Sequence, residues 1–178
     1  MKSLQTKLFS GLLVLSAAGA LQAARPNILL LNADDLGWTD TGFMGSAYYE
    51  TPHLDRLAAS GMVFTQAYAS ASNCAPSRSS LYSGQALPRH GVYTVDSPAR
   101  GKAAHRKLIP SSNEQFLDPS IPTFPKLLQQ AGYQTIHVGK WHVGKDPTDA
   151  GFDINIGGSE WGHPKKGFFS PYRIEGFD

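Results

Sequence analysis

Six side chains in this sequence have types and spacing that suit chemistry on an anionic substrate. They are two adjacent carboxylates, the only cysteine and three basic residues: Asp34, Asp35, Cys74, Arg78, Lys140 and His142. Adjacent acids repel each other, so such a pair is comfortable only when it is solvated or shares a cation. Hard divalent cations such as calcium take several carboxylate and carbonyl oxygens. A bare Asp-Asp pair is nevertheless more often a solvated turn with a helix cap.

The cysteine lies at the start of a segment that predicts a short helix. Residues Pro76 to Ser83 can form it, with Pro76 in the first turn and Gly84 as the stop. Cys74 then lies near a helix N-terminus, where free N–H groups and the positive end of the dipole suit a negative charge. Most lone cysteines, in contrast, are small buried hydrophobic residues.

Two apolar runs predict strands that lead toward these residues. Residues 28–32 form a continuous apolar run directly before Asp34, and we expect a strand buried on both faces, as in a parallel sheet. Open α/β sheets bind ligands at the carboxyl ends of such strands. Met62 to Tyr68 predicts a second strand, which leads to the loop before Cys74.

Two further helices and a third strand are predicted. Residues 51–61 and 123–132 each predict a helix, with threonine before it, proline in the first turn and glycine at the end. Tyr133 to Val138 predicts a strand, and Lys140 and His142 follow its carboxyl end. We therefore expect both basic side chains on the same rim as the two aspartates and the cysteine.

Three stretches closely resemble the type I sulfatases, the formylglycine-dependent enzymes of the alkaline-phosphatase-like superfamily. Residues 74–78 match the signature Cys-x-Pro-Ser-Arg, which a leucine and Ser83-Gly84 follow. Residues 132–142 match the second signature at every specified position, and residues 26–37 resemble the family's opening strand with its Asp-Asp pair. Two motifs in the family's order are a far rarer chance match than either motif alone.

The resemblance implies a fold and a set of roles. The fold is α/β, an alkaline-phosphatase-like and mostly parallel sheet flanked by helices, truncated after its N-terminal part. In that family the cysteine is oxidised after synthesis to formylglycine, and the hydrate of this aldehyde attacks sulfur. The implied roles are catalysis by Cys74, Arg78 and His142, substrate binding by Lys140 and His142, and calcium ligation by Asp34, Asp35 and Cys74. Gln85 stands where the family usually has a basic residue that helps to hold the nucleophile loop, which puts that contact in doubt.

The implied activity is hydrolysis of a sulfate ester, on a sulfated carbohydrate or an aryl sulfate. A formylglycine-generating maturation enzyme is the implied partner, and calcium the implied cofactor. One alternative is a phosphoester or phosphonate-ester hydrolase of the same superfamily, which a substrate panel would separate. Another is an inactive secreted binding relative, which would keep an unmodified Cys74 and show no dependence on calcium.

The N-terminus predicts export. Residues 1–23 read as a signal peptide, with Lys2 and Lys7 before an apolar run from Leu8 to Leu21. That run is too short for a comfortable transmembrane helix, so we expect a periplasmic or secreted protein without stable membrane insertion, a retained anchor being the weaker alternative. Residues 24–178 are expected to form the N-terminal portion of a sulfatase catalytic domain, incomplete and inactive alone, because sulfatases are several hundred residues long.

Charge and composition exclude some functions and leave one region open. The formal net charge of +2 supports no nucleic-acid binding. Residues 95–120 have weak periodicity and read as a long surface excursion, with a basic group at Lys102, His105, Arg106 and Lys107. A solvated positive loop is the first interpretation. A rim that attracts a polyanionic substrate is the alternative, because long loops without regular structure are uncommon unless they are functional.

Overall fold

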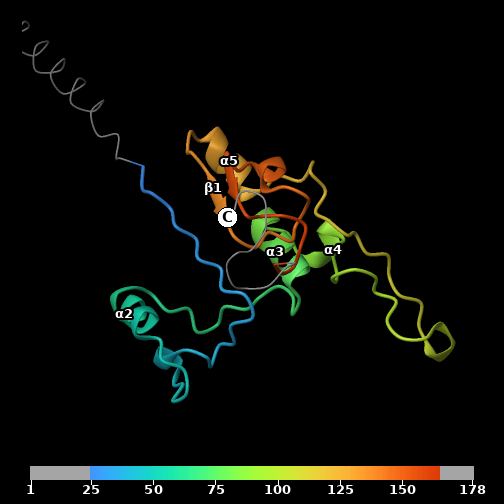
Figure 1. Ribbon diagram of the computed structural model, residues 1–178, viewed down its shortest axis with the longest axis horizontal. Helices are drawn as coiled ribbons and strands as arrows, with labels where there is room; N and C mark the ends of the chain where they lie inside the picture. Colours follow the sequence, from blue (N-terminus) through green and yellow to red (C-terminus); the bar gives the residue numbers. More distant parts are fainter. Residues whose placement is uncertain (1–24, 165–178) are drawn as a thin grey trace, which may run out of the picture.

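The computed structural model describes residues 25–164, so the predicted signal peptide, residues 1–23, lies outside the described residues. The described elements are, in chain order, η1 (Gly42–Met44), α2 (Pro52–Ser60), α3 (Cys74–Ser83), α4 (Leu87–His90), η2 (Ala103–His105), α5 (Phe124–Gln130), β1 (Ile136–Val138), η3 (Pro147–Ala150) and β2 (Ile154–Ile156). Helix α3 lies between α4 and the group formed by β1 and α5, while α2 and η1 lie apart from it (Figure 1). In the described part, no helix combines the length and apolar character needed to cross a membrane.

The three predicted helices form close to their expected bounds. Helix α3 begins at Cys74, two residues earlier than predicted, and ends at Ser83, with Gly84 as its C-cap at a φ of 65°. Helices α2 and α5 each follow a threonine and carry proline in the first turn. Thr123 does not cap α5 with its side chain, because its hydroxyl donates to the carbonyl of Ala150 at 2.6 Å. Proline and glycine therefore correctly predicted where these helices lie. Thr123, in contrast, makes a long-range contact instead of a cap.

Strands β1 and β2 form a parallel pair. Ile136 lies opposite Ile154 and Val138 lies opposite Ile156. The connection between the two strands contains Lys140 and His142 and then η3. Because parallel strands need a crossover, this connection leaves the carboxyl end of β1, which is where open α/β sheets carry their ligand-binding residues.

An aromatic cluster joins α3 to that connection. Tyr82 of α3 packs edge-on against Trp141, with ring centroids 4.6 Å apart, and stacks on Phe124 of α5 at 5.2 Å. Trp141 is 1% exposed and contacts Phe152 on its other side. Since Trp141 lies between Lys140 and His142 in the chain, burial of its indole fixes the backbone that carries both basic side chains.

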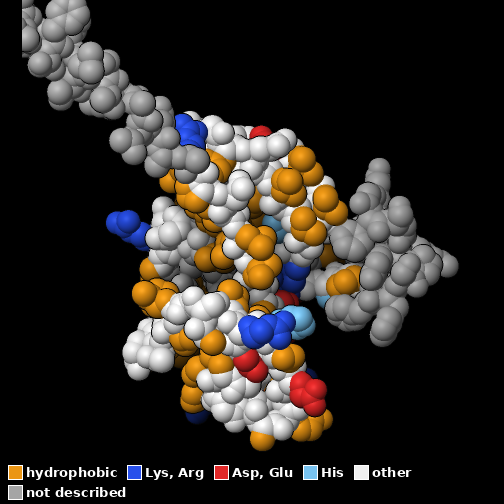
Figure 2. Space-filling view, turned by 90° about the vertical axis from the view of Figure 1, so that its left-hand side faces the viewer, with side chains coloured by type: hydrophobic (Ala, Val, Ile, Leu, Met, Phe, Trp, Pro, Cys, Tyr) orange, Lys and Arg blue, Asp and Glu red, His pale blue; other side chains and the backbone are white. Residues whose placement is uncertain are grey.

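Two predicted strands do not appear in the structure. Residues 28–32 have no strand partner, and the side chains of Leu29 and Leu31 are 82% and 72% exposed. Met62 to Tyr68 is likewise irregular and exposed. The prediction of a strand buried on both faces is wrong here, because such a strand needs neighbours at both edges and cover on both faces, and residues 25–164 pair only β1 with β2. Hydrophobic side chains consequently lie exposed over the face shown in Figure 2.

Gly151 follows η3 at a position where only glycine fits. Its φ is 93°, and a Cβ there would lie 2.5 Å from the backbone nitrogen and 2.7 Å from the Cα of Lys126 in α5. We expect Gly151→Ala to lower the free energy of unfolding by about 2–4 kcal/mol, since left-handed strain and a backbone clash add. Denaturant unfolding measures this change.

Gly101→Ala is the matched control for this substitution. Gly101 also has a positive φ, of 67°, but a Cβ there meets no atom within 4 Å. The free energy of unfolding of the control should fall by only about 1–2 kcal/mol, which is the cost of the backbone conformation alone. Equal losses in the two variants would show that the close approach of η3 to α5 contributes nothing.

Candidate active site

Arg78 is the centre of the site. It lies on α3, is 6% exposed, and donates from Nη1 to the carbonyl of Lys140 at 2.6 Å. Its Nη2 donates to Oδ1 of Asp34 at 3.3 Å. One buried guanidinium thus joins α3, the segment after residue 33 and the connection after β1. Cys74 lies four residues earlier on the same helix, which places both side chains on one helix face.

Two cationic side chains contact the carboxylate of Asp34. Lys140 donates from Nζ to its Oδ2 at 2.6 Å, while Arg78 occupies Oδ1. Burial by itself raises the pKa of Asp34, but the hydrogen bond and charge of Lys140, together with the charge of Arg78, outweigh it and lower the pKa below its usual value. Asp34 is therefore ionised at neutral pH, and the network of Asp34, Arg78 and Lys140 combines one negative charge with two positive charges.

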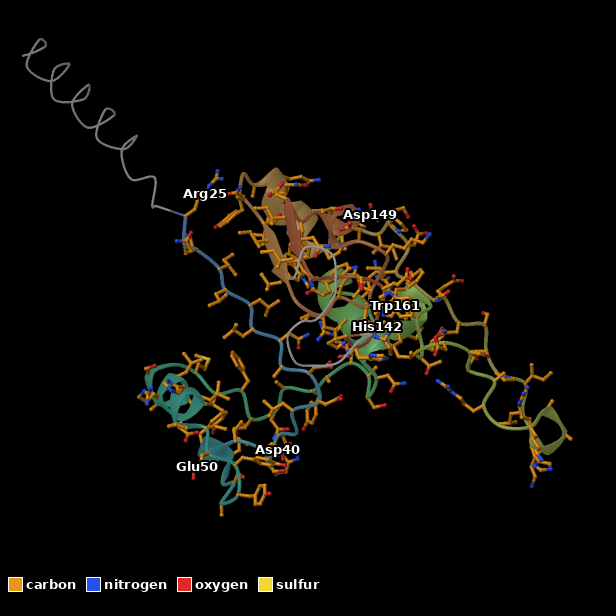
Figure 3. The ribbon with its side chains drawn as sticks, in the orientation of Figure 1. Arg25, Asp40, Glu50, His142, Asp149 and Trp161 are labelled. Carbon is orange, nitrogen blue, oxygen red and sulfur yellow. The ribbon has the colours of Figure 1, made fainter. Side chains whose placement is uncertain are left out.

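His142 is held in an unusual backbone conformation beside this ion network. Its φ is 59°, its N–H donates to the carbonyl of Ser159 at 3.0 Å, and its ring packs directly against Gly162. Burial, followed by the charges of Lys140 and Arg78, lowers its pKa. The buried Nδ1 has no hydrogen-bond partner among residues 25–164. At neutral pH the imidazole is therefore neutral and can take up a proton. Figure 3 shows His142 and Trp161 beside α3.

Non-glycine residues with a strained backbone conformation cluster at this site. Within the described residues, the non-glycine positions with positive φ are Asp35, Asp96 and His142, at 55°, 58° and 59°. Two of them are predicted site residues, and the charge of Asp96 acts on the pKa of His142, opposing the larger effects that lower it. Asp and His tolerate this region better than most residues. Such strain persists only where the surroundings enforce it, and it is concentrated at active sites and ligand-binding segments.

The structure brings some of the predicted residues into contact and leaves others nearby. Asp34, Arg78 and Lys140 touch directly, and His142 lies within electrostatic reach of all three. Cys74 is half-buried at the start of α3. Within residues 25–164, neither Cys74 nor Asp35 shows a hydrogen bond or ion pair from its side chain.

Sequence reasoning missed the residues that support the site. Asn73, which directly precedes Cys74, donates from Nδ2 to the hydroxyl of Thr94 at 3.1 Å instead of capping α3. Ser159 and Gly162 hold the backbone and ring of His142. An asparagine before a helix is typical of a cap, and nothing in the local sequence pointed to Thr94.

The described residues fit only part of a calcium site. Asp34 and Asp35 offer carboxylate oxygens, the ligands that calcium prefers, but two carboxylates supply only part of the roughly six to eight oxygens it takes. No three histidine, cysteine, aspartate or glutamate side chains within residues 25–164 come together as a metal cluster. The donor chemistry thus suits calcium, and the coordination shell needs further ligands.

Comparisons with known proteins agree on one family. The family model described as Sulfatase matches residues 26–174. The N-acetylgalactosamine-6-sulfatase of Canis lupus familiaris is 40% identical over 164 residues, which are 90% of this chain and 30% of that protein. The chain thus spans about 30% of the length of this curated relative.

Solved structures show the same similarity. The crystal structure of Ps i-CgsB matches with a TM-score of 0.61 and 34% identity, over 76% of this chain and 29% of that one. The complex of Ps i-CgsB with k-i-k-neocarrahexaose matches with a TM-score of 0.56 and 32% identity, over 71% and 27%. These matches confirm the predicted α/β fold class, with its parallel sheet, for the part of the fold that the chain covers.

Proposed function

The chain belongs to the sulfatase family, and from this premise we propose that it carries part of the active site of a sulfuric ester hydrolase acting on a sulfated carbohydrate. The observation that supports this most is the ion network at Asp34. Arg78 of the first signature and Lys140 of the second converge on that carboxylate, at 3.3 Å and 2.6 Å. Since the chain spans about 30% of the relative's length, we propose the activity for a protein of the relatives' length that contains it, here called the full-length protein. We expect little activity from the 178 residues alone.

The basic residues have separate roles in this proposal. Arg78 holds the carbonyl of Lys140 and the carboxylate of Asp34, so it fixes the geometry of the site as well as its charge. The ammonium of Lys140 is less buried than Arg78, and we assign it to the sulfuryl oxygens of the substrate. Preorganised positive charge of this kind stabilises the charge that develops on those oxygens.

His142 is assigned as the group that accepts a proton. Its ring is neutral at neutral pH, and its position is fixed by the surrounding protein, as a general base requires. Cys74, at the start of α3, is assigned as the position of the nucleophile, after oxidation to formylglycine by a maturation enzyme. An aldehyde hydrate there supplies an oxygen nucleophile, whereas an ordinary thiol does not account for the family's chemistry.

Calcium is assigned to Asp34 and Asp35, with Cys74 after its modification as a further ligand. When bound, the ion supplies positive charge that lowers the pKa of a bound hydroxyl group and attracts a sulfate oxygen. The remaining ligands of its shell are expected outside residues 25–164. We also propose that residues 1–23 direct export to the periplasm or the medium, and that residues 24–178 belong to one catalytic domain.

The glycan substrate class follows from the relatives. One is named as an N-acetylgalactosamine-6-sulfatase, and one neighbouring structure contains a neocarrahexaose. A panel of sulfate esters, phosphate esters and phosphonate esters, tested on the full-length protein co-produced with a formylglycine-generating enzyme, tests the proposal. We expect hydrolysis of the sulfate esters. A preference for phosphate or phosphonate esters would move the protein to the alternative hydrolase class.

Gly162 offers a direct test of the placement of His142. A Cβ at position 162 would lie 2.6 Å from Cε1 and 2.8 Å from Nδ1 of the imidazole, so Gly162→Ala must displace the ring. Since general acid–base groups contribute about 10²–10⁴-fold, we expect kcat/KM to fall by about 10–100-fold. Steady-state hydrolysis of 4-nitrophenyl sulfate measures the change.

Gly144→Ala is the control, because its Cβ would meet only Nε1 of Trp141 at an ordinary 3.7 Å. That variant should retain activity within about twofold, since no side chain has to move. Equal activity of the two variants would contradict the proton-accepting role of His142.

A further inference from the structure

A basic arm projects from the molecule next to the site. We define the basic arm as residues 97–112, which contain no aspartate or glutamate. Its charged and titratable side chains are Arg100, Lys102, His105, Arg106 and Lys107, all exposed. In Figure 1 the arm extends away from α3 and α4 as a long excursion with η2 near its far end. This is the region that the sequence left open between a solvated loop and a rim for a polyanion.

The arm has internal order, unlike a random solvated loop. The guanidinium of Arg100 donates to the carbonyl of Val95 at 2.7 Å. The guanidinium of Arg106 donates to the carbonyls of Arg100 at 3.2 Å and Gly101 at 3.3 Å. The two arginines therefore shape the arm, and Lys102 and Lys107 have no hydrogen bond or ion pair to any residue of the described chain. The ion pairs found within residues 25–164 lie at Asp34, so no carboxylate neutralises the arm.

One asparagine closes the base of the arm. Oδ1 of Asn113 accepts hydrogen bonds from the N–H groups of Tyr93 at 2.7 Å and Thr94 at 3.0 Å. Its Nδ2 donates to the carbonyls of Thr94 at 3.2 Å and Asp96 at 2.9 Å. These bonds hold the two ends of the excursion together, so the arm leaves the body from a fixed point.

That fixed point is attached to the catalytic segment. The hydroxyl of Thr94 accepts from Nδ2 of Asn73, the residue directly before Cys74. Asp96, at the foot of the arm, is close enough to influence the pKa of His142. The base of the arm therefore adjoins the residue before Cys74 and lies near His142.

From this arrangement we propose that the basic arm binds the sulfate groups of a polysaccharide chain that flank the ester being hydrolysed. The proposal rests on the proposed sulfatase function and deepens it, because it makes a sulfated polymer the preferred substrate over a small aryl sulfate. Lysine ammonium groups attract sulfate as point charges. Cations that form no ion pair within residues 25–164 give the arm the positive field that such a polyanion requires.

The variant Lys102→Gln/Lys107→Gln tests the arm in the full-length protein. The probe is dextran sulfate, used as an inhibitor of 4-nitrophenyl sulfate hydrolysis and, separately, as a titrant in calorimetry. The loss of two charge contacts at exposed positions should weaken the binding of dextran sulfate by about 5–20-fold in both assays. The kcat/KM for 4-nitrophenyl sulfate should stay unchanged, because neither lysine is assigned to the site. The inhibition should also become less sensitive to salt.

The control is Arg56→Gln/Lys145→Gln, which removes the same charge from exposed positions outside the arm. Equal weakening in the two double variants, or no weakening in either, would overturn the arm as a binding surface. If the unsubstituted protein hydrolyses no sulfate ester, the proposed function fails. The calorimetric comparison alone still tests whether the basic arm binds dextran sulfate. Loss of 4-nitrophenyl sulfate hydrolysis in the arm variant alone would also contradict the proposal, since it would place the lysines in the chemistry.

Discussion

Replacing Cys74 with alanine should reduce sulfate-ester hydrolysis by the full-length protein by at least about 10⁴-fold, as expected when a nucleophile is removed. The side chain is half-buried at the first residue of α3 and makes no hydrogen bond or ion pair within residues 25–164. The substitution therefore removes the oxidisable group without breaking a hydrogen bond or an ion pair. The unfolding midpoint should change little, so loss of activity would report on chemistry alone. Initial rates with 4-nitrophenyl sulfate measure the effect.

Cys74→Ser separates two explanations for that loss. A serine preserves the size of the side chain and offers a hydroxyl group, but an unoxidised serine that became sulfated could not eliminate sulfate, and the mass of its peptide shows that it stays unoxidised. If the hydrate is required for turnover, the serine variant should hydrolyse no faster than the alanine variant over many turnovers. Multiple turnover by the serine variant at more than a hundredth of the unsubstituted rate would contradict the assignment of position 74.

Arg78→Ala should lower both activity and stability. The guanidinium is buried and donates to the carbonyl of Lys140 and the carboxylate of Asp34. Its removal leaves that carbonyl without its donor and takes one of two positive charges from the carboxylate. We expect kcat/KM to fall by about 10³-fold and the free energy of unfolding to fall by about 2–4 kcal/mol. Initial rates and denaturant unfolding measure the two effects.

Two companion variants make this result specific. Arg78→Lys retains a positive charge but lacks the planar fork that reaches two partners, so it should lose activity and keep more stability than the alanine variant. Lys140→Ala removes a more exposed group, and its stability should change by less than about 1 kcal/mol while activity falls as steeply as in Arg78→Ala. If Lys140→Ala is fully active, the lysine does not contact substrate and the proposed division of roles is wrong.

Elements whose signals are local could be predicted from the sequence. Helix α3 was predicted because Pro76 and Gly84 mark its first turn and its end, and α2 and α5 were predicted from the same signals. Lys140 and Asp34 were expected on one rim, by the rule that ligand residues gather at the carboxyl ends of parallel strands, and they are in contact, although no strand precedes Asp34 within residues 25–164. Both kinds of inference depend on short-range pattern or on general topology.

Features that depend on distant partners could not be predicted in the same way. The apolar run of residues 28–32 reads as a buried strand, but its burial requires neighbouring elements that residues 25–164 do not provide. His142 has a left-handed backbone conformation that Ser159 and Gly162 support, and nothing in the local sequence predicts it. The bonds from Asn73 to Thr94 and from Asn113 to the base of the arm likewise join residues about twenty positions apart.

The chemical state of position 74 tests the central claim most directly. Trypsin should release the peptide of residues 57–78, since no lysine or arginine lies between Arg56 and Arg78. Its mass should be measured in protein from a host that matures other sulfatases. The account predicts an aldehyde, in which one oxygen has replaced the sulfur and two hydrogens of the cysteine side chain. An unmodified thiol in that host would contradict the proposed nucleophile and favour an inactive binding relative.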